Sequence, residues 1–395
     1  MKKLNIALIG FGTAGRGFYE AWQQLGTARF NIHGVAVKNG EKKRNGLHLE
    51  ATTDVLSLIN DPAVDVVVEA TGNVKDAKIW YEATIKNRQL FVTANKQLVA
   101  QLSGFGNQNL LYEASCGGAL PIVRLLETCF PHGVSSIRGV LNGSTNYILT
   151  RIFVDGFSFN DGLLIAKEAG FVEADERLDL DGGDPATKLR ILCRHAFGIR
   201  LLADDVAVFP LLGFNDVDVK FIRRNKLAVR YIATAALDEG KIVARVAPEL
   251  VAEEHPFAKV LNEENAVSII DKGGESYFFK AKGAGKQPTG TALFNDLEAW
   301  SQGFRYKKRK LAKAKSSPEI SEVIVRTAVD FRDQLTAETI ESWIEGGFRF
   351  YRLRCYLHEL AHIAVVKSGE ACVFVVGKEV SRQRFKPESV LSIEY

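Results

Sequence analysis

The chain between residues 170 and 192 reads GFVEADERLDLDGGDPATKLRIL, an acidic segment that runs into a lysine and an apolar stretch. A helix is predicted to begin just after the glycine pair, because Pro185 suits the first turn of a helix. We expect four side chains to converge at this helix start: Glu173, Asp179, Asp184 and Lys188. Carboxylates beside an ammonium group suit a small substrate that carries both an ammonium group and a hydroxyl. An acidic loop before an N-capped helix is the alternative interpretation.

The N-terminal segment is typical of a dinucleotide-binding unit. The apolar run LNIALI at residues 4–9 predicts a strand, and it is followed by GFGTAGRG and by the helical pattern FYEAWQQL. In this order Gly10 allows the tight turn, Gly12 lets the backbone approach a pyrophosphate, and Gly15 lets the helix pack on the strand. The residues expected to bind the cofactor here are Gly10, Phe11, Gly12, Thr13, Ala14 and Gly15. A glycine-rich turn that binds nothing is the alternative.

The loop after the second predicted strand bears on the choice of cofactor. That strand should end near Val37, and the chain then reads KNGEKKR where NAD-binding proteins usually place an acidic residue for the ribose hydroxyls. A basic cluster that begins at Lys38 favours a 2′-phosphate, so NADP is the predicted cofactor. Glu41 leaves NAD possible, and a solvated basic loop is the alternative.

Two further buried strands are predicted, within VDVVVEATG at residues 64–72 and QLFVTANK at residues 89–96. In a doubly wound sheet the ligand binds at the carboxyl ends of the strands. The residues expected at the nicotinamide end are therefore Thr71, Gly72, Thr93, Ala94, Asn95 and Lys96. At this position Lys96 is either a group that handles substrate and protons or a simple surface charge.

Six segments make the chain resemble the homoserine dehydrogenase family over roughly its first three quarters. They are GFGTAGRG, VTANK, LYEASCGGALPIV, GVLNGSTNYIL, AKEAGFVEADERLDLDGGDPATKL and GAGKQPTGTALFNDL. Most weight falls on EASCGGALPI, LNGSTNYIL and the spacing EADxxxDxxGxDxxxK. The resemblance implies NAD(P)-dependent interconversion of L-homoserine and L-aspartate 4-semialdehyde, a step of threonine and methionine biosynthesis.

The same resemblance implies roles for the polar residues named above. Lys96 and Lys188 would lie near the reacting carbon, and Lys188 would donate and accept the proton. Glu173 and Asp184 would bind the ammonium and hydroxyl groups of the substrate, and Asp179 would support them; the expected catalytic group is Lys188, Lys96 and Asp184. A lysine accepts a hydroxyl proton only when its pKa falls below about 10.4, which a second cation favours and neighbouring carboxylates oppose.

Two further sites are implied by the resemblance alone. Gly170 and Gly285 would approach the cofactor with their backbones. Glu113, with the backbone carbonyls of Cys116, Gly118 and Leu120, would form a monovalent-cation site, usually for sodium. Whether the Cys116 thiol makes activity redox-sensitive is left open.

The length of 395 residues allows two or three domains. We expect an α/β protein with a Rossmann dinucleotide-binding domain at residues 1–136, to which a helix at about 293–316 returns. An α+β substrate-binding and dimerisation domain should span residues 137–292. A small C-terminal βαβ domain, ACT-like and divergent, should span residues 318–395, with LTAETIESWIEGG as its helix. The Asp-x-Pro-Gly usual at its first turn is absent, so a feedback ligand is not assigned and the domain is expected to serve in assembly.

The composition narrows the class of protein further. A net charge of +4 does not imply nucleic-acid binding, and no apolar run approaches the ~20 residues needed to span a membrane. Five scattered cysteines fit reduced thiols in the cytoplasm. The basic run RYKKRKLAKAK is expected to be a solvated helix end and linker. The expected partners are the small-molecule substrate and further copies of the chain, as a homodimer or homotetramer.

Other classes of protein remain as alternatives. His358-Glu359-Leu360-Ala361-His362 matches the HExxH signature of zinc hydrolases, but it follows a strand-like segment and lacks a GxxH extension, so we expect a chance match at a strand end. A non-catalytic NADP-binding regulator would not need the lysines and carboxylates named above. A Rossmann dehydrogenase acting on another amino acid or semialdehyde is the nearest enzymatic alternative.

Overall fold

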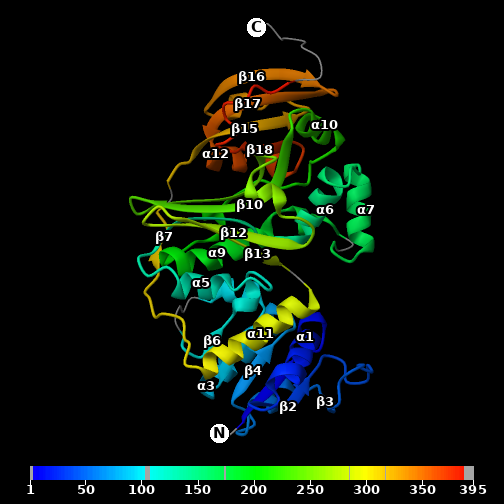
Figure 1. The fold of residues 1–395 in the computed structure, drawn as a ribbon, viewed down its shortest axis with the longest axis vertical. Helices are drawn as coiled ribbons and strands as arrows, with labels where there is room; N and C mark the ends of the chain where they lie inside the picture. Colours follow the sequence, from blue (N-terminus) through cyan, green and yellow to red (C-terminus); the bar gives the residue numbers. More distant parts are fainter. Residues whose placement is uncertain (1–2, 103–106, 173–174, 284, 316, 387–395) are drawn as a thin grey trace. The chain divides into compact units, whose positions relative to one another are not determined.

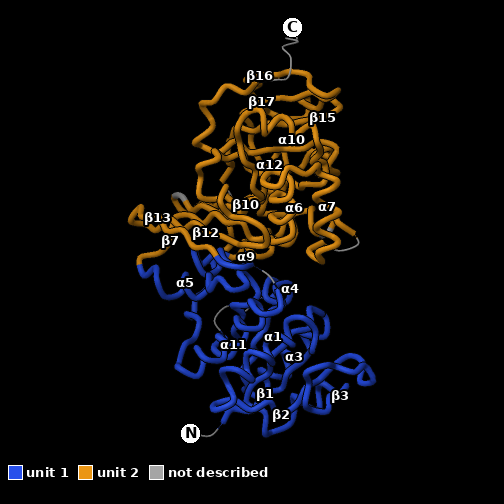
Figure 2. The backbone as a smooth tube through the Cα atoms, turned by 45° about the vertical axis from the view of Figure 1, so that its right-hand side comes forward, with its two compact units in different colours: residues 1–131, 190–199, 281–312 blue, residues 132–189, 200–280, 313–395 orange. Residues whose placement is uncertain are grey.

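The computed structural model describes residues 3–102, 107–172, 175–283, 285–315 and 317–386. It divides into two compact units, each assembled from three separate stretches of the chain (Figure 2). Unit 1 comprises residues 1–131, 190–199 and 281–312, and unit 2 comprises residues 132–189, 200–280 and 313–395.

Unit 1 is built on a parallel six-stranded sheet in the order β3-β2-β1-β4-β5-β6 (Figure 1). Its strands are β1 (Leu4–Ile9), β2 (Phe30–Ala36), β3 (Ala51–Thr52), β4 (Val66–Glu69), β5 (Leu90–Thr93) and β6 (Leu110–Leu111). The strands β1, β4 and β5 are almost fully buried, as expected for a parallel sheet covered on both faces. The strand order and parallel pairing confirm the predicted Rossmann arrangement.

The helices of unit 1 connect these strands or pack on them. They are α1 (Thr13–Ala21), continued by a π-helical turn at Trp22–Gly26, α2 (Val55–Ile59), α3 (Val74–Lys86), α4 (Lys96–Gln101), the 3-10 turn η2 (Glu113–Ser115), α5 (Ile122–Thr128) and α11 (Lys286–Ser301). The helices α1 and α11 pack side by side at two glycines (Figure 1). A Cβ on Gly17 would lie 1.9 Å from the Lys286 carbonyl oxygen, so only glycine permits this approach.

Unit 2 is built on a larger, ten-stranded sheet in the order β13-β12-β7-β10-β11-β18-β15-β17-β16, with β9 paired to β11. Its strands are β7 (Val134–Val140), β9 (Ala207–Val208), β10 (Leu227–Asp238), β11 (Lys241–Ala252), β12 (Glu264–Asp271), β13 (Ser276–Lys282), β15 (Ile320–Thr327), β16 (Ala337–Glu345), β17 (Phe348–Tyr356) and β18 (Cys372–Val376). The short strands β8 (Ile199–Arg200) and β14 (Ala312–Lys313) pair with each other in a separate two-stranded sheet.

Helices accompany this sheet, and one of them continues into unit 1. They are α6 (Gly143–Phe153), α7 (Phe159–Glu168), α8 (Arg177–Leu180), α9 (Gly183–Phe197), α10 (Asp216–Arg224), α12 (Leu357–His362) and α13 (Ala364–Lys367), with 3-10 turns at Ala203–Asp205, Pro256–Lys259 and Arg332–Gln334. The division between the units falls within α9, after Leu189. A buried cluster that includes Phe209, Val325, Tyr351 and Leu360 packs the C-terminal strands and helices together.

The helix predicted within LTAETIESWIEGG is wrong, because this segment forms the strand β16. Gly346 and Gly347 both adopt positive φ angles, +57° and +79°, and these angles turn the chain tightly into β17. The stacked rings of Trp343 and Phe350 face each other across the hairpin. The elements after residue 318 therefore start with three strands rather than a βαβ unit, and an ACT-like domain is not confirmed.

The basic run RYKKRKLAKAK is not the end of a helix, because α11 ends at Ser301. Most of the run is irregular, and Arg309 donates hydrogen bonds to the His195 carbonyl oxygen and to the Glu127 carboxylate. The Arg309 side chain thus attaches this part of the basic run to unit 1. No helix in the described ranges is both long and apolar enough to cross a membrane.

Candidate active site

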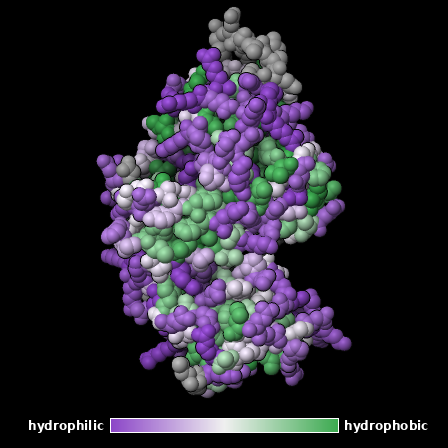
Figure 3. All heavy atoms as spheres, in the orientation of Figure 1, coloured by the Kyte–Doolittle hydropathy of each residue, from purple (hydrophilic) through white to green (hydrophobic). Residues whose placement is uncertain are grey.

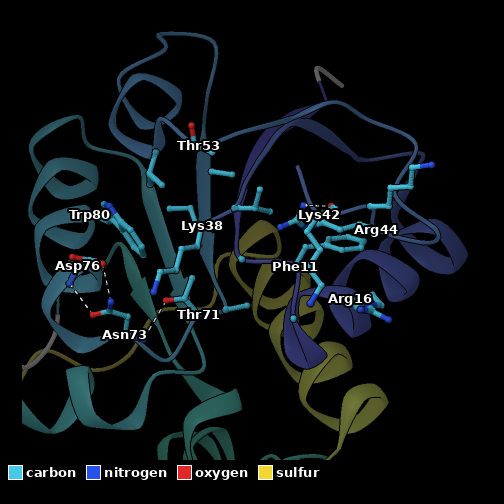
Figure 4. Close-up of a pocket in the computed structure, with 18 residues that line it drawn as sticks. Phe11, Arg16, Lys38, Lys42, Arg44, Thr53, Thr71, Asn73, Asp76 and Trp80 are labelled. Carbon is cyan, nitrogen blue, oxygen red and sulfur yellow. Dashed lines mark hydrogen bonds between the residues drawn. The ribbon is translucent and has the colours of Figure 1, made fainter. Parts of the chain in front are cut away.

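A cavity of about 690 Å³ opens in unit 1 at the carboxyl ends of β1, β2 and β4. Figure 4 shows that side chains from separate elements face it, among them Lys38 after β2, Thr71 after β4 and Trp80 from α3. The residues that line it are Ile9, Gly10, Phe11, Gly12, Arg16, Ala36, Val37, Lys38, Lys42, Lys43, Arg44, Thr53, Val55, Ala70, Thr71, Asn73, Asp76 and Trp80. The cavity lies where a doubly wound sheet binds its ligand.

The glycine turn at one end of this cavity has the geometry of a phosphate-binding loop. Gly10 has a φ of +94°, and a Cβ on Gly15 would lie 2.0 Å from the Gly10 carbonyl oxygen. By contrast, a Cβ on Gly12 would meet no atom within 4 Å, so the space above this residue is open. Thr13 and Ala14 begin α1, and no side-chain hydrogen bond caps this end of the helix in the described structure. The open N-terminus of α1 fits the pyrophosphate of a dinucleotide.

Five basic side chains face the cavity: Arg16, Lys38, Lys42, Lys43 and Arg44. Asp76 is the one acidic residue among those that line it. The Arg44 guanidinium donates to the carbonyl oxygens of Lys42 and Asn39, both at 2.6 Å, and so holds the loop in shape. The donor set fits a phosphate group on the ribose that lies near the end of β2.

A buried carboxylate joins the ends of β4 and β5. Glu69 accepts hydrogen bonds from the Thr71 backbone N–H at 2.7 Å, the Thr71 hydroxyl at 2.6 Å and the Thr93 hydroxyl at 2.5 Å. Glu69 is fully buried at the end of an otherwise apolar strand. Glu69 is not among the residues predicted from the sequence, although an acidic residue inside VVVEATG is a readable signal. Thr71 and Thr93 are positioned by this carboxylate, and Gly72 follows with a φ of +74°.

Asn95 and Lys96 stand at the start of α4. The Asn95 side chain accepts a hydrogen bond from the Leu98 N–H at 3.0 Å and thereby caps the helix. Its Nδ2 is buried without a hydrogen-bond partner among the described residues, so it can donate to a bound group. Lys96 is the first residue of α4 and is half-buried.

In unit 2 the structure brings Asp184 and Lys188 together on the first turns of α9. The Lys188 Nζ lies 2.9 Å from Asp184 Oδ2 and donates to the Leu141 carbonyl oxygen at 2.6 Å. Asn142 donates to the same Asp184 oxygen at 2.9 Å while its own oxygen caps α6 at the Thr145 N–H. Both ends of the Lys188–Asp184 pair are largely buried, with exposed fractions of 13% and 17%. Asn142 is not among the residues predicted from the sequence; its signal is an asparagine between a strand and a helix in LNGSTN.

The other residues predicted for the substrate and the cofactor lie in different places. Asp179 is half-buried in the short helix α8 of unit 2, and Gly170 follows α7 with a φ of +75°. Gly285 precedes α11 in unit 1 with a φ of +117°. Glu173 lies outside the described residues. The convergence of Lys96 with Lys188 remains a prediction, since the two lysines belong to different units.

Glu113 is a buried carboxylate at the N-terminus of α5. Its two oxygens accept hydrogen bonds from the backbone N–H groups of Val123 and Arg124, each at 2.8 Å. Burial, with the nearby Asp296 carboxylate, raises the pKa of Glu113 to about 8. A small cavity of about 70 Å³ is lined by Glu113, Gly118 and Ala119, among others. Each carboxylate oxygen keeps a further lone pair, so the site fits a monovalent cation.

The remaining residues predicted for that cation lie in the loop between η2 and α5. Cys116 and Leu120 are buried, and Gly118 has a φ of +60°. The Leu120 carbonyl oxygen already accepts a hydrogen bond from the Ile122 N–H at 2.8 Å. Throughout the residues that the structure describes, no three His, Cys, Asp or Glu side chains gather as a metal-binding group.

The HELAH segment forms the helix α12, which begins directly after the strand β17. The strand predicted before it is confirmed, the segment itself is helical, and the chance match stays a prediction. The rings of His358 and His362 lie 4.5 Å apart, and His362 Nδ1 contacts the His358 carbonyl oxygen at 2.7 Å. The helix is six residues long and places both histidines on one exposed face. A zinc site still lacks a third ligand among the described side chains.

Comparisons with known proteins agree with this geometry. The family model described as "Homoserine dehydrogenase, NAD binding domain" matches residues 10–118, and the one described as "Homoserine dehydrogenase" matches residues 121–297. A homoserine dehydrogenase of Bacillus subtilis is 35% identical over 327 residues, which cover 77% of this chain and 74% of the relative. One from Helicobacter pylori is 32% identical over 309 residues, 75% of this chain and 73% of the relative.

Solved structures extend the likeness over nearly the whole chain. A homoserine dehydrogenase from Thiobacillus denitrificans has a TM-score of 0.80 at 23% identity, covering 95% of this chain and 98% of that one. One from Staphylococcus aureus has a TM-score of 0.72 at 26% identity, covering 96% and 100%. A hyperthermophilic archaeal homoserine dehydrogenase in complex with NADPH has a TM-score of 0.63 at 22% identity, covering 78% and 100%.

The Rossmann sheet, the open glycine turn and the basic cavity define a nicotinamide-dependent oxidoreductase. The chain belongs to the homoserine dehydrogenase family. Its reaction is therefore the NAD(P)-dependent interconversion of L-homoserine and L-aspartate 4-semialdehyde, and the family implies a place in threonine and methionine biosynthesis.

Proposed function

We propose that Lys188 carries the proton of this reaction and that Asp184 holds Lys188 in place. The observation that carries the proposal is the arrangement of hydrogen bonds around the Lys188 ammonium. Of its three N–H donors, one is used by the Leu141 carbonyl oxygen and one by Asp184 Oδ2. With respect to the residues that the structure describes, the third is left for the substrate oxygen, which receives the proton on reduction and returns it on oxidation.

The bound nicotinamide supplies the hydride acceptor or donor. Asn142 keeps Asp184 oriented through the hydrogen bond to its Oδ2. Asp184, with Glu173 and the supporting Asp179, binds the ammonium and hydroxyl groups of the substrate. Lys96, the first residue of α4, is the second lysine of the proposed catalytic group.

NADP is the cofactor that the basic cavity favours. Lys38 lies two residues after the end of β2, where we place the ribose of the adenosine half, and its side chain faces the cavity (Figure 4). Lys42 and Lys43 also line this cavity. The fold accommodates NADPH in an archaeal relative. Gly170 and Gly285 both have positive φ angles, and their proposed role is to approach the cofactor with their backbones.

Sodium is the cation that Glu113 would hold, together with the carbonyl oxygens of Cys116, Gly118 and Leu120. The support is the buried carboxylate beside a small cavity, described above. A cation there would neutralise Glu113 and fix the loop between η2 and α5.

We further propose that the protein acts in the cytoplasm as a homodimer or homotetramer. Apolar residues gather on one side of unit 2 where β7 and β12 lie (Figure 3). Ile270, Tyr277 and Phe278 on β12 and the edge strand β13 are each about two-fifths exposed, at 37%, 40% and 40%. Exposed aromatic residues on an edge strand suit contact with a second copy of the chain.

The experiment that tests the roles is reduction of aspartate 4-semialdehyde, followed in parallel with NADPH and NADH. Wild type and Lys188→Ala are compared, with NADPH binding measured on both. Loss of turnover with retained binding supports the role of Lys188. Wild-type turnover with another semialdehyde in preference would favour the different-substrate alternative, and binding without any turnover would favour the regulator.

A further inference from the structure

A buried arginine connects α9 to the short helix that begins with Lys96. Arg194 lies six residues after Lys188 on α9, and its exposed fraction is 2%. Its guanidinium donates to the Val99 carbonyl oxygen at 2.8 Å and to the Ala100 carbonyl oxygen at 2.5 Å. Both carbonyls belong to the last turn of α4, and all of these atoms lie in unit 1.

The helix α4 needs such a contact because it is only six residues long. The last four carbonyl groups of any helix lack partners within the helix, and helices this short are marginal by themselves. A cation at the C-terminus also interacts favourably with the helix dipole, and charged donors make the stronger hydrogen bonds. Asn95 caps the start of α4, and Arg194 satisfies its end.

The turn of α9 that carries Arg194 is itself held firmly. The neighbouring His195 is buried, and its ring contacts the Tyr112 hydroxyl at 2.9 Å and Glu127 Oε1 at 2.7 Å. Glu127 in turn accepts a hydrogen bond from the Lys307 N–H at 3.0 Å. These contacts hold the turn of α9 that carries Arg194, so the Arg194 side chain reaches α4 from a fixed part of the helix.

We propose that Arg194 is a positioning residue for the reaction: it holds α4, and through α4 it sets the place of Lys96. This inference rests on the proposed role of Lys96. Lys96 is the first residue of α4, so a displacement of this short helix moves Lys96 with it. A small displacement of α4 would then change turnover more than it changes binding, since misplacement of about 1 Å can cost on the order of 100-fold in rate.

The chain offers a matched control in Arg230 on β10. This arginine is also buried, with an exposed fraction of 1%, and it also donates to backbone carbonyls, those of Val229, Ala258 and Val260. It lies in unit 2 and touches none of the proposed catalytic residues through these bonds. Arg230→Met therefore reports what the loss of a buried guanidinium does to stability alone.

The experiment compares wild type, Arg194→Met, Arg194→Lys and Arg230→Met. It measures kcat and KM for aspartate 4-semialdehyde, the Kd of NADPH, and hydrogen exchange of the amides at residues 96–101. We expect Arg194→Met to lower kcat by about 30- to 100-fold, with KM and Kd changed less than about threefold, and to speed exchange in α4. Arg194→Lys should recover about a tenth or more of the wild-type kcat, because one ammonium can still donate to one of the two carbonyls.

Two results would overturn the inference. One is a kcat for Arg194→Met that matches that of Arg230→Met at equal folded fraction. The other is an Arg194→Lys variant that keeps the wild-type kcat although its amides in α4 exchange faster than those of the wild type. This result decides the question if Arg194→Met does not fold. An inactive wild-type protein would instead contradict the proposed function, and the exchange data would still show whether Arg194 holds α4.

Discussion

The Lys188 ammonium lies 2.9 Å from Asp184 Oδ2, one helical turn earlier on α9. The carboxylate is shared, because the Asn142 amide donates to the same oxygen at 2.9 Å. A lysine held by a carboxylate, with the Leu141 carbonyl oxygen as its second partner, has little freedom to move. The pair thus supplies an ammonium group in a fixed direction, which is what proton transfer to a substrate oxygen requires.

Lys188→Ala should lower kcat for semialdehyde reduction by about 100- to 10,000-fold, the range for removal of a general acid or base. The Kd of NADPH should stay within about threefold, because Lys188 lies outside the cofactor cavity. Steady-state kinetics and fluorescence titration measure the two quantities. Lys280→Ala is the control, since Lys280 forms an exposed ion pair with Glu264 in the same unit. Equal losses in the two variants would contradict the proposed role.

Lys38→Ser should shift the cofactor preference from NADP towards NAD. The side chain of Lys38, two residues after the end of β2, lines the cavity, so its removal should weaken NADPH binding by about 10-fold, the cost of one charged hydrogen bond. NADH binding should change less than about twofold. Lys78→Ser is the matched control, because Lys78 is exposed on α3 and does not line the cavity. If NADPH and NADH weaken together, the basic loop has only a general electrostatic effect.

Glu69→Gln should destabilise unit 1 and weaken cofactor binding. The carboxylate accepts three hydrogen bonds from Thr71 and Thr93, and glutamine replaces one accepting oxygen with a donor. A buried donor left without an acceptor costs about 1–3 kcal/mol. Urea unfolding followed by circular dichroism measures this loss, and Glu82→Gln on the exposed side of α3 should leave stability unchanged. A wild-type midpoint for Glu69→Gln would show that the carboxylate is dispensable.

The sequence predicts the nucleotide half of the molecule well, because its signals are local. The turn from Gly10 to Gly15 requires glycines at fixed spacing, and β1, β4 and β5 are continuous apolar runs. The helix predicted within LTAETIESWIEGG is instead the strand β16, because the pairing that forms this strand depends on a partner outside the segment. A strand forms here because the positive φ angles of Gly346 and Gly347 turn the chain into β17. The stacked rings of Trp343 and Phe350 then stabilise the hairpin.

The supporting residues of the site are harder to predict, because their roles depend on contacts between distant segments. Asn142 becomes relevant only when α6 and α9 bring it to Asp184, 42 positions away in the sequence. Arg194 is one of two arginines on α9, and nothing local shows that it reaches residues 99 and 100. Asp184 and Lys188, by contrast, are four residues apart on one helix, so their spacing alone places them side by side.

The stability of unit 2 should fall as the pH rises from about 4 to about 6, through the buried Asp218. Burial raises the pKa of Asp218 to about 6, although the Arg326 guanidinium donates to it at 2.7 Å and opposes the rise. An unfolded aspartate has a pKa of about 3.9, so the folded state binds the extra proton in this window. Stability is therefore highest below the unfolded pKa and is lost as the pH rises through the folded one, by on the order of 2–3 kcal/mol.

Asp218→Asn tests this contribution because it keeps the shape of the side chain and removes the titration. Urea unfolding of unit 2 is measured between pH 4 and pH 7, and the difference between wild type and variant is followed against pH. That difference should change across the window and level off above it. A difference that is the same at pH 4 and pH 7 would mean that Asp218 keeps its ordinary pKa in the folded protein.

Replacing sodium by choline at constant ionic strength should lower both activity and thermal stability, if Glu113 holds a monovalent cation. The physical reason is that a cation bound only to the folded state stabilises it, by about 2.7 kcal/mol at 100 times its Kd. Choline is too large for a cavity of about 70 Å³. Calorimetry and semialdehyde reduction are followed as sodium is returned, and both should recover along one saturation curve.

Glu113→Gln is the decisive variant for the cation, because it removes the charge and keeps the size of the side chain. One of the two backbone N–H groups of α5 keeps an oxygen acceptor and the other loses it, so the readout is the response to sodium rather than absolute stability. Its activity and melting temperature should no longer respond to sodium. Glu298→Gln serves as the control, since Glu298 lies on α11 of the same unit and pairs with Arg29. That control should keep the full sodium response. Should Glu113→Gln respond to sodium as wild type does, the cation binds elsewhere, and the buried Glu113 serves only to cap α5.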